Sequence, residues 1–218
     1  MHAWFLSHPH PDHIDALMSI LNNPGDLKIG SIYGSVPDEK WVAAHEPTPP
    51  SHLDSLVAFN KALRGSEKRV SELSLGQEII VDGLHIKILG VKNPEIHANP
   101  INNSSVVIRV SDAGKSVLFL GDLGAAGGRK LLQGPHRDRL KSQYVQMAHH
   151  GQAGVSEDVY QVIQPSYCLW PTPLWLWDND NGGGEDSGPW RTLTVRKWMK
   201  KLSVRENYVS GKSLVQID

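Results

Sequence analysis

The sequence has little cysteine and no long apolar run. Cys168 is its one cysteine in 218 residues, so neither an intramolecular disulfide nor a zinc site built from several thiolates can form. No apolar stretch is long enough for a membrane span, and the N-terminus does not combine a basic region with an apolar one. From these absences we expect a cytoplasmic protein without a membrane partner.

The chain also lacks an excess of charge of either sign. It carries 22 Lys and Arg against 23 Asp and Glu, which gives a formal net charge of −1. A protein that holds nucleic acid by charge alone usually has a strongly basic surface, so that class is not indicated, although a local basic patch stays open. With 39% hydrophobic and 21% charged residues, we expect residues 1–218 to form a single globular domain.

What the chain does have is a dense group of metal-ligand side chains near its start. Residues 3–6 are apolar and predict a buried strand, and residues 7–13 then read Ser-His-Pro-His-Pro-Asp-His. The two prolines exclude regular helix or a central strand, so this segment is predicted to be a loop. We expect Asp12 to cap a helix over residues 14–21.

Four of these loop residues can bind metal: His8, His10, Asp12 and His13. On an extended loop His8 and His10 point to the same side, whereas Asp12 and His13 turn towards a second position as the helix begins. Imidazole together with carboxylate suits zinc, manganese or iron. A chance grouping of four such residues is a poor explanation, so the motif predicts two neighbouring metal positions.

Two later segments can complete these positions. Asp122 follows an apolar strand within Gly-Asp-Leu-Gly, where glycine permits close approach of the backbone, and it is the candidate for a carboxylate shared by both metals. The pair His149-His150 follows a predicted strand at 144–148. We favour His149 as the ligand of this pair. Taken alone, either segment would also suit an ordinary turn after a strand.

The remaining pattern predicts strands and helices that mix without strict alternation. Hairpins are expected at 77–81 with 84–91 and at 106–110 with 116–120, and further strands at 29–33, 166–170 and 213–217. Helices are expected at 52–63, 125–132, 156–163 and 191–202. Loops are expected at 36–51, as a lid, and at 171–189. Mixed sheets with outer helices fit this order.

Several of these motifs together resemble the metallo-β-lactamase superfamily. The segment 7–13 looks like its first metal motif, and residues 102–107, 118–122 and 148–151 are similar in order and spacing to the hydrolase domain of competence-type (ComEC-like) proteins. The resemblance extends to about Tyr167. It implies an α/β fold with mixed sheets, the four-layer αβ/βα sandwich, with the metals at one edge between the sheets.

Two departures from the family pattern affect these expectations. Many members place a third histidine on the first metal, whereas this chain has Asn102-Asn103 there, as competence-type relatives do. His97 is the nearest substitute in sequence. Members also normally carry strands before the first motif, which here begins at His8, so we expect the sandwich to lack its first strands.

The resemblance implies a metal-dependent hydrolase with two divalent ions, zinc by preference and manganese or iron as alternatives. A hydroxide bridging the ions would attack the substrate. Asp12 would bind metal or orient the nucleophile, and His150, the member of the histidine pair not favoured as a ligand, would protonate the leaving group. Competence-type relatives suggest a phosphodiester substrate, nucleic acid included. The oligomeric state is not indicated.

Several alternatives remain open. The enzyme could hydrolyse an ester, lactone or thioester on the same fold, or the chain could be an inactive copy that binds one metal or none. A redox protein is disfavoured because no Gly-rich nucleotide motif is present.

His45 and His52 are expected at the surface rather than at the site. The aromatic and basic residues near the C-terminus could form a stacking rim, although packing is favoured for the tryptophans: Trp175, Trp177, Trp190, Arg191, Arg196 and Lys197.

Overall fold

The computed structural model describes residues 1–46, 51–214 and 216. The strands are β1 (Ala3–Phe5), β2 (Ser31–Gly34), β3 (Val70–Glu72), β4 (Glu78–Val81), β5 (Leu84–Gly90), β6 (Val107–Ser111), β7 (Ser116–Phe119), β8 (Tyr144–Gln146), β9 (Tyr167–Trp170) and β10 (Glu206–Val209). The helices are α1 (Pro11–Asn22), α2 (Glu39–His45), α3 (Ser51–Gly65), α4 (Pro100–Asn103), α5 (Ala125–Gln133), α6 (Glu157–Ile163), α7 (Leu174–Trp177) and α8 (Thr192–Lys201). Short 3-10 turns cover Arg137–Arg139 and Ala148–Gly151.

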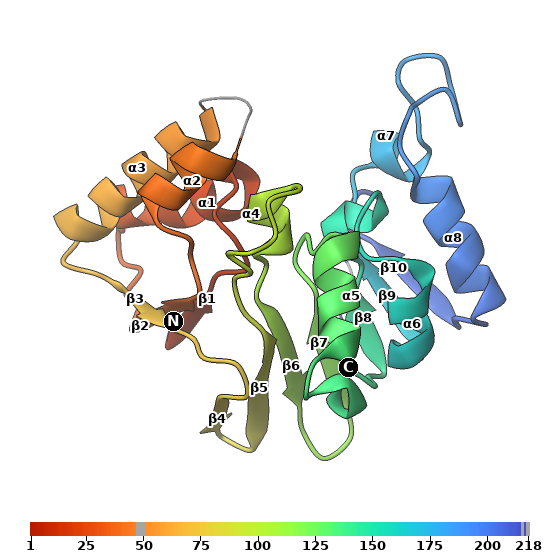
Figure 1. The fold of residues 1–218 in the computed structure, drawn as a ribbon, viewed down its shortest axis with the longest axis horizontal. Coiled ribbons are helices and arrows are strands. Elements are labelled where there is room, and N and C mark those ends of the chain that lie inside the picture. The colour runs from red at the N-terminus through yellow and green to blue at the C-terminus, as the bar shows by residue number, and fades with distance from the viewer. Residues whose placement is uncertain (47–50, 215, 217–218) are drawn as a thin grey trace.

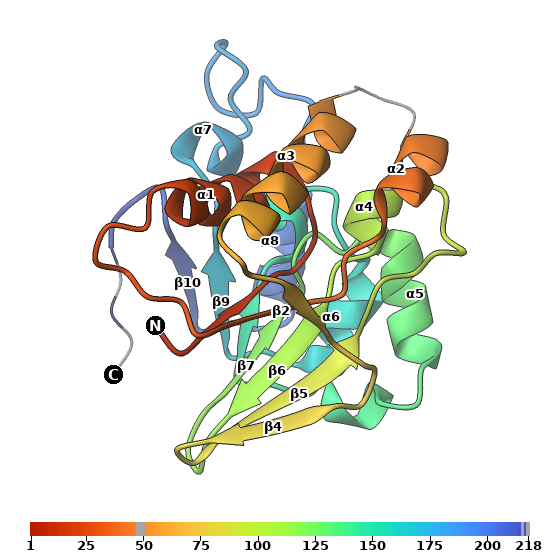
Figure 2. The same cartoon turned by 90° about the vertical axis from the view of Figure 1, so that its left-hand side faces the viewer.

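The strands form two sheets that face each other. The first has the order β1-β2-β3 and is parallel throughout, and the second has the order β10-β9-β8-β7-β6-β5-β4. Within the second sheet, β4 to β7 pair antiparallel and β7 to β10 pair parallel. Helices α1, α2 and α3 lie against the first sheet, and α5, α6 and α8 lie against the second (Figure 1). Figure 2 shows β4 to β7 side by side below the α1–α3 layer.

Alternation along the strands produces three apolar layers. In the first sheet Ile32 points to a core shared with α1 and α3, whereas Phe5 and Tyr33 point to a core between the sheets, where their rings stack at 5.1 Å. In the second sheet Ile88 faces that same inner core, and its neighbour Leu89 faces a core under the α5, α6 and α8 helices. The predicted four-layer αβ/βα arrangement is therefore confirmed.

The topology brings several strand ends to one edge. Strands β7, β8 and β9 are parallel, so their carboxyl ends lie together, and the loop after β1 reaches the same edge because Ser7 O accepts a hydrogen bond from Val106 N at 2.8 Å. In open α/β sheets, ligands bind at such carboxyl ends. The predicted metal motifs follow β1, β7 and β8, so the fold gathers them.

Some predicted elements differ from the structure. The lid loop predicted for 36–51 contains helix α2, because the Asp38 side chain accepts a hydrogen bond from Trp41 N at 2.8 Å and caps the helix, and Val42 is buried. Residues 47–50 of that segment lie outside the described part of the chain. Asp12 does not cap α1, since the helix begins at Pro11, a residue suited to the first helical position.

The prediction of a strand at 213–217 was wrong for the residues that the structure describes there. In the described part of the chain the final strand is β10, which pairs with β9; residues 213, 214 and 216 are not in a strand, and residues 215 and 217 lie outside the described residues. Strand β3 and helices α4 and α7 were not predicted; all three have four residues or fewer, too short for a periodic signal. Within the described residues, no helix combines the length and apolar character needed to cross a membrane.

The core between the first sheet and its helices should dominate the stability of the N-terminal half. Leu56 on α3 is 1% exposed within it, so Leu56→Ala should lower the free energy of unfolding by about 2–5 kcal/mol through lost burial and the cavity left behind. Leu174→Ala is the matched control, because Leu174 is 47% exposed and should change stability little. Urea denaturation followed by circular dichroism measures both, and equal losses would contradict this layer assignment.

Candidate metal centre

The loop after β1 and the loop after β7 converge on one buried carboxylate. Asp122 is 2% exposed, and its backbone N–H donates to the Ser105 hydroxyl at 3.0 Å. That hydroxyl also lies 3.3 Å from His8 Nδ1. Gly121 precedes the aspartate with φ +55°, and a Cβ there would come within 2.9 Å of Ser7 and Ser105. Only glycine therefore lets the two loops approach this closely.

The first set of candidate ligands consists of His8, His10 and Asp122. One donor atom from each lies within 4.8 Å of the others. His8 Nε2 is 3.2 Å from His10 Nδ1 and 3.8 Å from Asp122 Oδ2. His8 is completely buried, which fixes its ring in the loop. The expectation that His8 and His10 share a side of the loop agrees with this geometry.

The second set consists of Asp12, His13, Asp122 and His150, again within 4.8 Å of one another. His13 Nε2 lies 3.5 Å from Asp12 Oδ2 and 3.4 Å from Asp122 Oδ1. His150 Nε2 lies 3.1 Å from Asp12 Oδ2 and 3.4 Å from Asp122 Oδ2. Asp122 thus belongs to both sets, as a carboxylate shared between two metals must.

The outer nitrogens of three of these histidines are held by oxygen atoms. His13 Nδ1 lies 3.2 Å from the Ser7 hydroxyl, His8 Nδ1 lies 3.1 Å from the same hydroxyl, and His150 Nδ1 lies 2.9 Å from the Pro171 carbonyl. A histidine that donates its outer N–H presents an unprotonated Nε2 on the other side, which is how ligand histidines are normally oriented. All three Nε2 atoms face Asp122.

An unusual backbone turn aims His150. His149 and His150 have φ values of 50° and 55°, both left-handed, and Gly151 follows at φ 80°. Left-handed residues other than glycine cost of order 1–3 kcal/mol each and are concentrated at functional sites. Surrounding contacts hold the turn: His149 N donates to Gly121 O at 3.1 Å, and Thr172 Oγ1 donates to His150 O at 2.6 Å.

The carboxylates remain ionised in this environment. Burial alone would raise the pKa of Asp122, but the nearby imidazoles of His13 and His150, together with His8, hold it well below its ordinary value. The contact with His150 lowers the pKa of Asp12 to about 2. Asp12 and Asp122 in turn raise the pKa of His150 to about 10. Without a metal the His150 ring therefore holds a proton between the two ionised carboxylates, and a bound cation would take the place of that proton.

The first two histidines are held neutral. Burial lowers the pKa of His8 well below its ordinary value, and burial and the neighbouring His52 lower the pKa of His10 to about 4. Neutral imidazole is the form that binds metal.

Several atoms of the cluster are buried and have no hydrogen-bond partner. Among the described residues, these include His13 Nε2 and Asp122 Oδ1, which lie 3.4 Å apart without forming a hydrogen bond. A buried polar atom without a partner is costly and usually marks a missing ion or water. The donor set of imidazole and carboxylate suits zinc, manganese or iron, so the residues present fit a divalent cation in each set.

The two histidines of the pair are placed differently from the sequence expectation. His150, not His149, lies with Asp12 and His13. His149 Nε2 is farther from the shared carboxylate, 3.9 Å from Asp122 Oδ2, and lies 3.4 Å from Gln152 Nε2. The sequence could not distinguish adjacent histidines, because the left-handed turn that separates them has no clear sequence signal.

His97, the nearest candidate in sequence for a third histidine on the first metal, does not lie in either ligand set. His97 is exposed, and its ring packs on His45 at 4.3 Å, away from both sets. Asn103 is a structural residue whose amide donates to Ala98 O at 2.7 Å and accepts from Gly127 N at 2.8 Å. His52, expected at the surface, instead lies against His10, with ring centroids 4.4 Å apart.

The tryptophans near the C-terminus divide into two groups. Trp177 is buried and meets Trp170 edge to face at 5.0 Å, with the Arg196 guanidinium 4.3 Å from its ring centroid, so it packs as favoured. Trp175 is 50% exposed and lies 4.8 Å from Trp190. Neither tryptophan of this second pair contributes to the cavity beside the metal centre.

No family model matches the chain, and no curated protein matches its sequence. Solved structures do match. The metallo-β-lactamase fold protein YhfI of Bacillus subtilis is 14% identical with a TM-score of 0.52, over 100% of this chain and 78% of that one. CmlA, a diiron β-hydroxylase of Streptomyces venezuelae, is 12% identical with a TM-score of 0.54, over 96% of this chain and 44% of that one.

The chain has the metallo-β-lactamase fold. Its two ligand sets lie at the sheet edge where the sequence resemblance placed them, while the identity values are low enough that the likeness concerns architecture alone. The activity has to be argued from the site.

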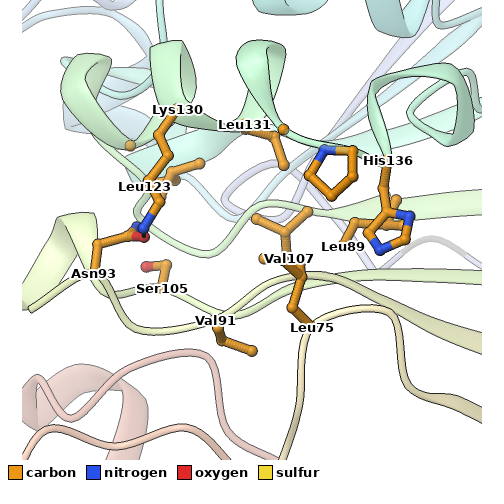
Figure 3. Close-up of a pocket in the computed structure, with 14 residues that line it drawn as sticks. Leu75, Leu89, Val91, Asn93, Ser105, Val107, Leu123, Lys130, Leu131 and His136 are labelled. Carbon is orange, nitrogen blue, oxygen red and sulfur yellow. Dashed lines mark hydrogen bonds between the residues drawn. The ribbon is translucent and has the colours of Figure 1, made fainter.

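Two cavities lie near this centre, and they differ in character. The larger, about 450 Å³, begins at His13 and His150 and continues between the sheets. The smaller, about 100 Å³, lies between α5 and the β5–β6 pair (Figure 3). At its wall Lys130 Nζ donates a hydrogen bond to Asn93 Oδ1 at 2.7 Å. Only the larger cavity opens on the candidate ligands.

The Asp12–His150 pair should make the metal-free protein sensitive to pH. The contribution of Asp12, whose pKa is depressed, is present above about pH 3.9 and is lost as pH falls towards 2. That of His150, whose pKa is raised, is present below about pH 6.5 and is lost as pH rises towards 10. With chelator present, the stability difference between wild type and Asp12→Asn should therefore be largest between these limits and shrink above pH 6.5.

Chemical denaturation over a pH series measures this difference. Asp15→Asn is the control, because Asp15 lies exposed on the same helix. A difference for Asp12→Asn that does not vary with pH would show that the pair does not titrate as a unit.

Proposed function

We propose that the protein is a hydrolase that uses two divalent metal ions. The observation that carries the proposal is the sharing of Asp122 by two sets of ligand atoms. His8 and His10 would hold one ion, and Asp12, His13 and His150 the other. Two such ions supply an activated water and positive charge to offset charge developing on the substrate. CmlA combines this fold with iron, so iron is retained beside zinc and manganese as a candidate.

The residues of the chain have separate tasks in this proposal. Ser7 and Ser105 orient the histidine ligands through their outer nitrogens, and the Pro171 carbonyl does so for His150. His149 is the imidazole left outside both sets, at the rim of the site, and we assign to it the protonation of the leaving group. This exchanges the roles that the sequence suggested for the two histidines.

Metal content per chain tests the site. Relative to wild type, Asp122→Ala should lose more than one of the two ions of these sets and His150→Gln about one, because each change removes donors from the sets described. Asp112→Asn, in an exposed turn, is the control for Asp122, and His149→Gln, which should keep both ions, is the control for His150. Activity should fall by at least about a hundredfold in Asp122→Ala.

Inductively coupled plasma mass spectrometry gives the metal content. Two ions that survive the loss of Asp122 would overturn the shared-carboxylate arrangement. A folded wild type without metal, even after reconstitution, would indicate an inactive copy.

The substrate class is proposed from two separate lines. The competence-type resemblance supports a phosphodiester, for which the two cations would bind the phosphoryl oxygens. A specific structural observation favours an ester or thioester with an apolar acyl group instead. The larger cavity runs from the ligands between apolar side chains and has no Lys or Arg among its lining residues. Those apolar side chains are Phe5, Ile86, Val106, Ile108, Val110 and Phe119.

One substitution separates the two substrate classes. Phe119 lines the cavity and is 40% exposed, so Phe119→Ala should fold. For p-nitrophenyl octanoate it should raise KM about tenfold, because apolar contact with the acyl chain is lost. For bis(p-nitrophenyl) phosphate it should change little.

Steady-state kinetics on both substrates make the comparison, with Ile80→Ala on exposed β4 as the control. Turnover of the phosphodiester alone, unaffected by Phe119→Ala, would support the phosphodiesterase assignment and exclude the acyl-binding role of the cavity.

A further inference from the structure

A second cluster of ligand side chains lies on the outer side of His10. Glu46 follows helix α2 directly, and His52 lies in the first turn of α3, so two helix ends bring these side chains to the loop after β1. The rings of His10 and His52 lie 4.4 Å apart at an angle of 41°. One donor atom each from His10, Glu46 and His52 lies within 4.8 Å of the others.

Each of these three residues has a buried polar atom without a hydrogen-bond partner. The atoms are His10 Nε2, Glu46 Oε2 and His52 Nδ1. His10 therefore uses its two nitrogens differently, because Nδ1 lies 3.2 Å from His8 Nε2 in the inner site while Nε2 has no partner. Three neighbouring side chains that each carry such an atom are costly unless something binds between them.

The spacing of the cluster favours a bound cation over a direct relay of hydrogen bonds. A relay would place neighbouring atoms at about 2.7–3.2 Å. Here the contact between His52 Nδ1 and Glu46 Oε1 is 3.8 Å. Ligands that each lie about 2.0–2.2 Å from a tetrahedral zinc are separated from one another by about 3.4 Å, so small side-chain movements would close this cluster around an ion.

We propose that His10, Glu46 and His52 form an additional divalent metal site. Two imidazoles and one glutamate are a donor set found at catalytic zinc sites with an open position for water. Zinc is the ion that we expect, held by His10 Nε2, His52 Nδ1 and the Glu46 carboxylate. When the inner site is also filled, the His10 ring binds a cation through each nitrogen, and its remaining ring proton is released to solvent.

This outer site does not depend on the proposed hydrolase activity. It requires neither Asp122 nor His150, and the inner site in turn requires neither Glu46 nor His52. The two can therefore be removed separately.

Zinc stoichiometry after exhaustive chelation and reconstitution tests the proposal. Native mass spectrometry of the full chain should show three zinc ions in wild type and two in both Glu46→Gln and His52→Gln. The controls are Glu95→Gln, which removes a surface ion pair with Lys130, and His97→Gln, whose ring packs on His45; both should keep three ions. Asp122→Asn should lose inner zinc and retain the outer ion.

Other results would overturn the proposal. Two ions in wild type, unchanged by Glu46→Gln and His52→Gln, would exclude the outer site and leave the inner one intact. If these variants keep wild-type stoichiometry but lower kcat, the pair positions His10 and binds no cation. If a variant does not fold, cobalt titration of wild type still decides, because a third equivalent must add a separate visible absorption. If wild type and Asp122→Asn both hold one ion, and Glu46→Gln removes it, the inner site binds no metal. That result would overturn the proposed hydrolase and leave the outer site supported.

Discussion

A buried carboxylate surrounded by imidazoles is the constraint on which the centre depends. Asp122 is almost completely inaccessible, and its ionised form must be balanced by nearby positive charge or by a bound cation. The protein provides His8, His13 and His150 around it, and none of the three lies on the same element as Asp122. The two sheets bring the loops together, Gly121 allows their close approach, and the Ser105 hydroxyl contacts both Asp122 N and His8 Nδ1. These features let the three histidines reach one carboxylate.

The two-sheet architecture makes this convergence possible. Parallel strands deliver their following loops to one edge, and the inner apolar layer fixes the distance between the sheets. The same separation leaves an apolar cavity that starts at the ligands. The separation of the two sheets therefore produces both the site and the cavity. Because the cavity begins at the candidate ligands, its apolar walls would contact a substrate bound there.

Much of the fold and of the candidate ligand group could be predicted from the sequence. His8, His10, Asp12 and His13 stand within six residues, and a grouping that dense needs no knowledge of tertiary structure. Asp122 could be proposed because it follows an apolar strand and adjoins glycine. Periodicity also indicated most helices and both hairpins. Helix α2 was missed because it has seven residues and stands between prolines at 37 and 47, in a segment whose Pro-rich composition is that of a loop.

Other features depend on contacts between distant segments. Which histidine of the pair faces the carboxylate is decided by a backbone turn that Thr172 and Gly121 hold in place. The approach of Glu46 and His52 to His10 is decided by how α2 and α3 pack on the first sheet. No local pattern encodes either relation, since the partners are separated by 20 residues or more.

The left-handed turn at residues 149–151 contacts the hydrophobic core on one side and the candidate metal centre on the other. A Cβ on Gly151 would lie 2.2 Å from the Trp170 ring, so this glycine is pressed against the hydrophobic interior while its neighbour reaches the carboxylate. The strain of the turn is maintained only while both contacts persist. If the proposed ion is bound, folding and metal loading form one linked equilibrium: tighter packing behind the turn would raise the affinity for the ion, and the ion would raise the melting temperature of the domain.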